Sequence, residues 1–191
     1  MTQRSATRRR SNLPYVLALA LMGGVVVTAW LARDVNRPVI AGEPAPNFSA
    51  TLLDGTPVSL DELQGKVVLL NIWATWCPPC RFEMPSMQRL EDAVDDADFM
   101  VVAVSVDAAE AGKPDAFGRI AGDVAAYIDE NGYTFTVWHD PQGGIQQTYQ
   151  TTGVPESFLI GRDGLIYKKV AGPTEWDAPE YLEMVRRLLG S

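Results

Sequence analysis

Hydrophobic and polar residues follow two different periods along most of the chain. Nearly continuous apolar runs at residues 66–73 and 99–106 are typical of strands buried on both faces of a sheet. Other segments place apolar residues at helical spacing, as Met87, Leu90 and Val94 do. Because such strands and helices alternate, the pattern predicts an α/β domain. No internal repeat is visible, which excludes a solenoid.

The expected order of elements is β-β-β-α-β-α-β-α-β-β-α. Strands are expected at 48–53, 58–60, 66–73, 99–106, 134–138, 157–160 and 165–170. Helices are expected after residue 80 with a kink at Pro85, at 115–131, at 144–150 and at the carboxyl end. At the start of the last helix, Asp177 and Glu180 have the spacing of a capping box.

A run of 22 uncharged residues, 11–32, lies near the amino end. This is about the length that a helix needs to span a bilayer. Arginines precede the run, and by the positive-inside rule they keep the amino terminus in the cytoplasm. We therefore expect a single-pass anchor in the inner (cytoplasmic) membrane, with the rest of the chain in the periplasm or another extracytoplasmic space. Cleavage after the small residues 27–29 is the alternative, but bulky Trp30 and Leu31 follow directly.

These features divide the chain into four parts. They are a basic cytoplasmic N-terminus (1–10), a transmembrane signal anchor (11–32), a proline-containing linker (33–46) and a folded domain (47–191). The linker has three prolines and no periodicity, which predicts an extended tether.

The charge distribution and the residue counts exclude two classes of function. The chain has 16 Lys and Arg against 24 Asp and Glu, and six of the basic residues but only one acidic residue precede Pro38. The remainder therefore has a net charge of −13, which would repel a phosphate backbone and excludes nucleic-acid binding. Two cysteines and one histidine cannot supply a four-ligand Cys/His zinc site within one chain.

The two cysteines stand in Cys77-Pro78-Pro79-Cys80, where the central strand ends and a helix begins. At a helix N-terminus, backbone N–H groups and the helix dipole stabilise a thiolate. We therefore expect Cys77 to be the attacking nucleophile and Cys80, one turn further on, to resolve the mixed disulfide. The two prolines restrict the loop between them. The sequence thus predicts thiol-disulfide exchange, with the Cys77–Cys80 disulfide as the redox group and no other cofactor or metal.

Three other interpretations of the pair are open. A structural disulfide would remove little chain entropy, since the loop that it closes is so short. Two thiolates could also hold Cu(I), which prefers soft sulfur ligands. A peroxidatic cysteine would have Thr and Pro three and seven residues before it, where this chain has Ala74 and Leu70.

Several segments resemble one known family. The motifs that carry the resemblance are Asn71-Ile72-Trp73-Ala74-Thr75-Trp76-Cys77-Pro78-Pro79-Cys80-Arg81-Phe82-Glu83-Met84-Pro85, Ala45-Pro46-Asn47-Phe48, Gly65-Lys66-Val67-Val68-Leu69-Leu70-Asn71 and Gly153-Val154-Pro155-Glu156-Ser157-Phe158-Leu159-Ile160. They are similar to membrane-anchored thioredoxin-like proteins of the TlpA/ResA/CcmG type, within the redoxin (AhpC/TSA-like) group. The resemblance implies a thioredoxin fold, in which helices flank a central mixed sheet with a four-stranded core and an added N-terminal β-hairpin. It also implies a cis peptide bond before Pro155, facing the cysteines.

The resemblance also suggests roles for individual residues. Glu83 matches the family's acidic residue near the cysteines, while Asn71 stands where cytoplasmic thioredoxins have a buried Asp. Glu156 resembles a Glu after the cis-proline, where its carboxylate would lie at the mouth of the groove. Trp76 is expected to form a partly exposed platform beside the redox loop, and Val154 to belong to the substrate-binding surface with the prolines. Residues 107–122 are longer than the family's usual connection and are interpreted as a solvated insertion, with a partner-docking loop as the alternative.

The expected function is reduction of protein disulfides outside the cytoplasm, as in the preparation of apocytochrome c for haem attachment. A general disulfide oxidant or isomerase and a non-enzymatic Cu(I) delivery protein are the alternatives. The expected partners are protein thiols or disulfides and a membrane electron donor or acceptor, and the protein is expected to be a monomer.

Overall fold

The structure is a computed structural model that describes residues 13–32, 38–115 and 117–190. The chain divides into two compact units, residues 1–38 and residues 39–191. The predicted basic segment 1–10 and the first part of the predicted linker, 33–37, lie outside the described residues.

In the first unit, the described residues form the helix α1 (Leu13–Ala32), within the predicted anchor. The helix has no acidic residue in its first turn and no basic residue in its last turn. None of the helices in residues 13–32, 38–115 and 117–190 combines the length and the hydropathy of a membrane span.

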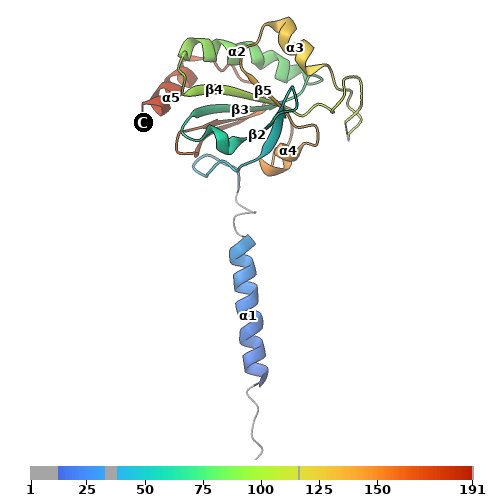
Figure 1. The fold of residues 1–191 in the computed structure, drawn as a ribbon. Coiled ribbons are helices and arrows are strands. Elements are labelled where there is room, and N and C mark those ends of the chain that lie inside the picture. Colours follow the sequence, from blue (N-terminus) through green and yellow to red (C-terminus); the bar gives the residue numbers. More distant parts are fainter. Residues whose placement is uncertain (1–12, 33–37, 116, 191) are drawn as a thin grey trace, which may run out of the picture. The chain divides into compact units, whose positions relative to one another are not determined.

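The second unit is built on one mixed sheet of seven strands (Figure 1). The strands lie in the order β2-β1-β5-β4-β3-β6-β7. Their bounds are β1 (Ser49–Leu52), β2 (Pro57–Ser59), β3 (Val67–Trp73), β4 (Phe99–Ser105), β5 (Thr136–His139), β6 (Glu156–Ile160) and β7 (Ile166–Ala171). Strands β3, β4 and β5 are parallel, and β6 runs antiparallel to β3. Strands β4, β3, β6 and β7 form the expected core, to which β5 and the β1–β2 hairpin are added.

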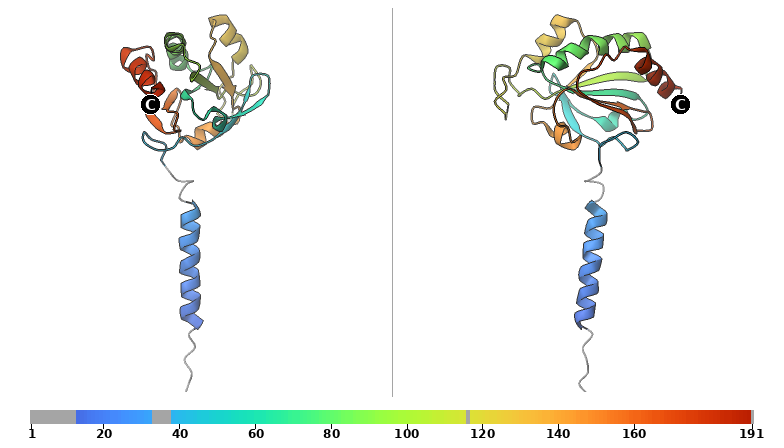
Figure 2. Two further views of the ribbon diagram at one scale, coloured as in Figure 1. Left: turned by 60° about the vertical axis from the view of Figure 1, so that its left-hand side comes forward. Right: turned by 180° about the vertical axis from the view of Figure 1, so that it is seen from behind.

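Helices cover both faces of the sheet (Figures 1 and 2). They are α2 (Pro78–Val94), α3 (Val124–Asn131), α4 (Gly144–Thr148) and α5 (Pro179–Leu189), with a short 3-10 helix η1 (Leu60–Leu63). Helices α2, α3 and α5 lie on one face, whereas α4 lies on the other. The expected order of elements and the thioredoxin-like α/β fold are confirmed.

The core explains why the redox loop has a fixed position. Every residue of β3 is buried, as its almost wholly apolar sequence predicts for a central strand. Helix α2 buries Met84, Met87 and Leu90 against the sheet, at the helical spacing of its apolar residues. The Cys-Pro-Pro-Cys segment therefore joins two well-packed elements, β3 and α2.

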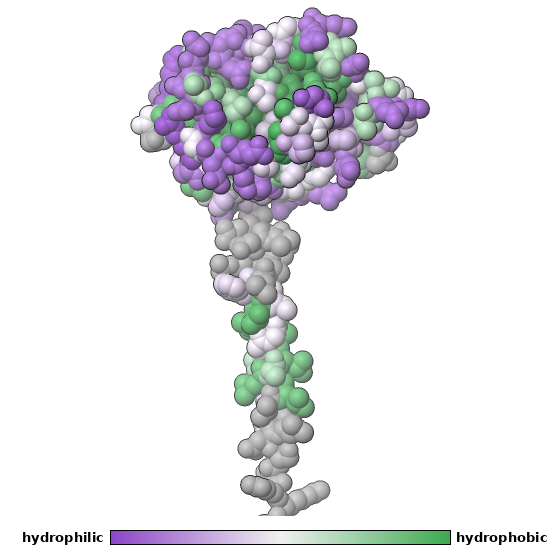
Figure 3. Space-filling model, viewed as in Figure 1, coloured by the Kyte–Doolittle hydropathy of each residue, from purple (hydrophilic) through white to green (hydrophobic). Residues whose placement is uncertain are grey.

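The visible surface of this unit is mainly hydrophilic, with smaller hydrophobic areas (Figure 3).

Residues 39–46, which the sequence assigned to the tether, instead pack on the folded unit. Val39 is buried, and the backbone of Gly42 and Glu43 exchanges hydrogen bonds with Ile166 of β7. Ala45 donates a further backbone hydrogen bond to Gly164. Prolines at 44 and 46 favour the extended backbone that pairs along a sheet edge, so the same composition serves both a tether and an edge segment.

The expected helix at 115–131 begins only at Val124. Asp123 is its N-cap and accepts a hydrogen bond from the backbone N–H of Ala126. Before it, Pro114 and Ile120 form an isolated β-bridge, and Gly118 has a positive φ of 78°. A carboxylate that caps a helix and a left-handed glycine both interrupt helical geometry, so the prediction was wrong for residues 115 and 117–123.

The capping box predicted at Asp177 and Glu180 is also wrong. Helix α5 begins at Pro179, and its N-cap is Ala178 without a side-chain cap. Asp177 forms an ion pair with Arg89 of α2, at 2.6 Å. The carboxylate thus links the turn before α5 to α2, a contact that local spacing cannot predict.

Candidate active site

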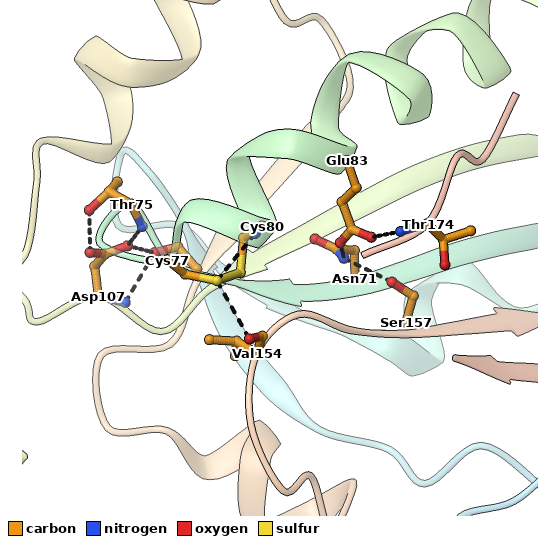
Figure 4. The surroundings of a disulfide bond; sticks show 10 residues. Asn71, Thr75, Cys77, Cys80, Glu83, Asp107, Val154, Ser157 and Thr174 are labelled. Carbon is orange, nitrogen blue, oxygen red and sulfur yellow. Dashed lines mark hydrogen bonds between the residues drawn. A yellow bond between two sulfur atoms is a disulfide. The ribbon is translucent and has the colours of Figure 1, made fainter. Parts of the chain in front are cut away.

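The two cysteines lie where β3 ends and α2 begins (Figure 4). They form a disulfide, and both side chains are nearly inaccessible, with exposures of 3% for Cys77 and 0% for Cys80. Pro78 and Pro79, by contrast, are exposed. The loop thus presents its prolines to solvent and the sulfur of Cys80 to the core.

Cys77 is the N-cap residue of α2. Its sulfur accepts a hydrogen bond from the backbone N–H of Cys80, at 3.2 Å. The following positions are Pro78 and Pro79, which have no N–H to leave unsatisfied at a helix start. A negative charge on this sulfur would meet the positive end of the helix dipole and a donated hydrogen bond, and both stabilise a thiolate.

The loop before β6 faces the disulfide. The Val154–Pro155 peptide bond is cis, which confirms the expectation drawn from the family resemblance. The carbonyl oxygen of Val154 lies 3.5 Å from the sulfur of Cys77. Pro155 is buried and Val154 is partly exposed. The predicted residues Cys77, Cys80, Val154 and Pro155 therefore do come together at one place.

Glu83 lies one turn after Cys80 on the same helix and is completely buried. Its two carboxylate oxygens accept hydrogen bonds from the side-chain amide of Asn71, at 2.6 Å, and from the backbone N–H of Thr174, at 3.1 Å. The Asn71 amide also donates to the hydroxyl of Ser157, at 2.8 Å. Figure 4 shows this group beside the disulfide, between α2 and the sheet.

The environment of Glu83 favours its neutral form. Burial raises the pKa of this carboxyl from 4.5 to about 7, although the hydrogen bonds from Asn71 and Thr174 act in the opposite direction. A carboxyl with this pKa changes its protonation near neutral pH, as a group that accepts and returns a proton must do. Sequence reasoning found Glu83 through the family resemblance, and the structure supplies Asn71 as its direct partner.

Glu156 does not lie at the mouth of a groove, as the sequence suggested. It is buried, and its carboxylate forms an ion pair with Lys169 of β7, at 2.9 Å. Successive strand residues point to opposite faces, and the neighbouring Ser157 faces Asn71 and α2. Glu156 therefore points to the other face of the sheet. It still contacts the loop before β6, since it accepts a hydrogen bond from the backbone N–H of Thr152 at 3.3 Å.

Trp76 is partly exposed, as expected of a platform beside the redox loop. The guanidinium of Arg119 stacks on its ring at 3.9 Å and lies 4.8 Å from the ring of Phe117. Arg119 also forms an ion pair with Asp115, at 2.6 Å. Part of the 107–122 loop therefore lies against the residue directly before Cys77.

A buried hydrogen-bonded group at the base of this loop was missed in the sequence. The Asp107 carboxylate accepts hydrogen bonds from the backbone N–H and the hydroxyl of Thr75, at 2.8 and 2.5 Å, and from the hydroxyl of Ser105, at 2.8 Å. The Thr75 hydroxyl accepts one from the N–H of Gly122, at 2.7 Å. One signal could have found it, since Asp107 follows a buried strand parallel to β3 and so lies at the same sheet edge as the redox loop.

Across the described ranges, no group of three or more His, Cys, Asp or Glu side chains is placed to hold a metal ion. His139 ends β5, and its Nε2 lies 3.0 Å from the backbone oxygen of Asp107. Beside the disulfide, this sheet edge thus carries two buried carboxyl side chains, Glu83 and Asp107.

A Cys-x-x-Cys disulfide between the central strand and the first core helix of this fold is typical of thiol-disulfide oxidoreductases, and the chain is an enzyme of this class. The sequence model of the AhpC/TSA family matches residues 41–169, and the chain belongs to this family.

Named relatives and solved structures agree with this assignment. Thiol-disulfide oxidoreductase ResA of Oceanobacillus iheyensis is 33% identical over 175 residues, which cover 90% of this chain and 84% of the relative. Thioredoxin-like protein YneN of Bacillus subtilis is 38% identical over 155 residues, which cover 79% and 84% of the two chains. The crystal structure of a thiol:disulfide interchange protein of the thioredoxin family from Chlorobium tepidum matches with a TM-score of 0.58 and 29% identity. It covers 78% of this chain and 97% of that chain.

Proposed function

We propose that the protein reduces disulfides of other proteins through Cys77-Pro78-Pro79-Cys80. The observation that carries the proposal is the position of Cys77, as the N-cap of α2 with a hydrogen bond from the N–H of Cys80 to its sulfur. This position favours a thiolate at Cys77, which is the form that attacks a disulfide. Cys80 is the more buried of the two, with no exposed surface, and its place inside the protein supports its role as the thiol that attacks Cys77 in the second step.

The reaction has two exchange steps. In the first, the Cys77 thiolate attacks one sulfur of the partner's disulfide, a mixed disulfide forms, and the partner's other sulfur leaves as a thiolate that takes up a proton. In the second, Cys80 loses its proton and attacks the Cys77 sulfur, which releases the partner's second thiol. The partner gains two electrons, and the enzyme ends as the disulfide drawn in Figure 4.

Glu83 is proposed to accept the proton of Cys80 in the second step. It lies three residues after Cys80 on α2, so the two side chains are on the same helical face. Its pKa of about 7 suits a group that takes a proton and then returns it to solvent or product. Asn71 and the backbone of Thr174 hold the carboxylate in place.

The proposed partners are extracytoplasmic proteins whose cysteines must be kept reduced, such as an apocytochrome c before haem attachment. Names of relatives such as thiol-disulfide oxidoreductase ResA support exchange between thiols and disulfides. The reducing direction and the cytochrome partner rest on the family resemblance. In this direction each turnover leaves the enzyme oxidised, and a membrane electron donor would have to reduce it again.

We also propose that the uncharged segment 11–32 anchors the protein in the cytoplasmic membrane and that the domain lies outside the cytoplasm. The support is the length of this segment and the arginines that precede it. A reporter enzyme that is active only outside the cytoplasm, fused after residue 191, should be active. Activity of a strictly cytoplasmic reporter at the same point would contradict the orientation.

The roles of the cysteines are tested by two single variants. Cys80→Ser should accumulate mixed disulfides with partner proteins, because the second step is blocked, whereas Cys77→Ser should form none and lose activity. Identification of the trapped proteins would name the physiological partners. If Cys80 of the reduced protein is alkylated faster than Cys77 at low pH, the assignment of the nucleophile is wrong.

The unsubstituted protein, isolated from cells, tests the two alternative functions, a disulfide oxidant or isomerase and a Cu(I) delivery protein. An oxidant would be found in the cell mainly as the disulfide, whereas a reductant should be found mainly as the dithiol. An isomerase also acts as the dithiol, but it would rearrange the disulfides of a scrambled substrate without net reduction. A Cu(I) delivery protein would retain stoichiometric Cu(I) through dialysis. Turnover of a disulfide substrate without metal would contradict the Cu(I) interpretation.

A further inference from the structure

Exposed hydrophobic side chains concentrate near the redox loop. Among the described residues from 38 onward, the three most exposed large hydrophobic side chains are Phe117 (79%), Phe82 (64%) and Ile120 (56%). Phe82 lies on α2 two residues after Cys80, and the other two lie in the 107–122 loop. Placing such side chains in water is unfavourable, and clusters of them mark surfaces that bind partners.

The 107–122 loop is tied to the redox loop at two points. At its base, Thr75 bonds to both Asp107 and Gly122. Nearer its tip, Arg119 lies against the rings of both Trp76 and Phe117. The hydrophobic side chains of this loop are therefore held in a defined place beside Cys77, and contacts with a partner would cost little additional ordering.

A hollow of about 720 Å³ joins this loop to the cis-proline loop. Its lining includes Phe117, Arg119, Gln146, Gln147, Thr152 and Gly153. Gly153 directly precedes Val154, whose carbonyl oxygen lies 3.5 Å from the Cys77 sulfur. One end of its lining is thus next in sequence to the residue that contacts Cys77.

The chemistry of this lining indicates what would occupy it. No carboxylate lines the hollow, although the unit as a whole is strongly acidic, and its one charged residue, Arg119, is already paired with Asp115. Glutamine and threonine side chains can donate to and accept from peptide groups. Phe117 offers an apolar contact at one end. An uncharged, extended polypeptide segment with large apolar side chains matches both features.

We propose that the 107–122 loop and Phe82 form a docking surface for unfolded polypeptide segments whose cysteines are flanked by large apolar residues. This inference rests on the proposed function, and it specifies the substrate class of the same site. Phe117 and Ile120 contact the segment on one side of Cys77, and Phe82 contacts it on α2 beyond the exposed prolines. The loop is then a specificity element and not a solvated insertion.

The test compares three disulfide substrates on the reduced full-length protein, in one detergent throughout. Two are short synthetic peptides, each with one Cys-Ala-Ala-Cys disulfide, flanked either by Phe and Leu or by Ser. The third is the small aromatic disulfide DTNB, which needs only access to Cys77. Phe117→Ser and Phe82→Ser are compared with Ile40→Ser. Ile40 is half-exposed, and it lies at the end of the sheet opposite to the cysteines, where Glu43 pairs with the start of β7.

Each Phe variant should raise the KM for the Phe/Leu-flanked peptide about fivefold. This is the loss of affinity expected when the burial of roughly half of a phenylalanine side chain is removed. The kcat for this peptide, the KM for the Ser-flanked peptide and the rate with DTNB should stay unchanged. The Ile40→Ser control should match the unsubstituted protein with all three substrates.

Three results would overturn the inference. Equal KM values for the Phe/Leu-flanked peptide in all four proteins would mean that the loop is only solvated. An equal fall in all rates, including that with DTNB, would mean that Phe117 and Phe82 act on Cys77 and not on the substrate. If the unsubstituted protein reduces none of the three disulfides, the proposed function itself has failed.

Discussion

Replacing Glu83 by Gln should remove a pH-dependent loss of stability. Burial raises the pKa of this carboxyl in the folded protein from 4.5, its ordinary value, to about 7. Below pH 4.5 the group is protonated in both the folded and the unfolded state and contributes no difference. Between pH 4.5 and 7 the carboxyl is ionised in the unfolded chain but still protonated in the folded protein, so the free energy of unfolding falls as the pH rises.

The size of this loss follows from the pKa values. A displacement of one pH unit corresponds to about 1.4 kcal/mol. Moving the pKa from 4.5 to about 7 therefore costs on the order of 3 kcal/mol at pH values above 7. Solvent screens this cost little, because the side chain is completely buried. That is a large part of the stability of an ordinary domain.

The assay is urea unfolding of the oxidised fragment from Pro38 onward, unsubstituted and with Glu83→Gln, at several pH values between about 5 and 8. Gln cannot accept the hydrogen bond from Thr174 at its nitrogen, but this cost does not vary with pH. The unsubstituted protein should lose roughly 2.5 kcal/mol relative to the variant across this range, since a small part of the loss has already occurred at pH 5. Glu130→Gln, at an exposed position of α3, controls for the substitution itself. A difference between the two proteins that stays constant from pH 5 to 8 would refute the reasoning.

Three further changes test other contacts. Gly122→Ala should lower the free energy of unfolding by about 1 to 3 kcal/mol, because its Cβ would lie 2.7 Å from the hydroxyl oxygen of Thr75; a thermal melt that matches the unsubstituted protein would contradict this. Lys169→Met should cost about 3 to 5 kcal/mol, since it leaves the buried Glu156 carboxylate without its ion pair, and denaturant titration measures the loss. Asp95→Gly should raise the melting temperature slightly, because Asp95 ends α2 with a positive φ of 43°; a lower melting temperature would count against it.

The elements that the sequence predicts well are those whose pattern is local. The apolar run that became β3 and the Cys-Pro-Pro-Cys segment after it are visible in the residues themselves, and the structure places both as expected. The cis bond at Pro155 came from the family resemblance, because few X-Pro bonds in folded proteins are cis and spacing alone cannot select one.

The contacts that were missed depend on residues far apart in the sequence. Whether Glu156 faces the site or the opposite side of the sheet depends on the register of β6 against β3, and a shift by one residue would reverse it. Asp177 has the correct spacing for a local cap, yet it pairs with Arg89, which is 88 residues away. Local spacing cannot rank such alternatives, since the competing partner becomes available only in the folded chain.

The parallel arrangement of β3, β4 and β5 has a consequence for how the protein can be altered. All three strands end at the same edge of the sheet, so the segments that leave them are neighbours, although they lie far apart in the sequence. The core beneath is made by the strands and by the buried face of α2. A segment such as 108–120 can therefore be exchanged between relatives without cutting into the core, provided that Asp107, the buried Ala121 and Gly122 are kept as its attachment points. The architecture is modular in this sense: the segment that carries the cysteines can stay the same while the loop beside it is replaced.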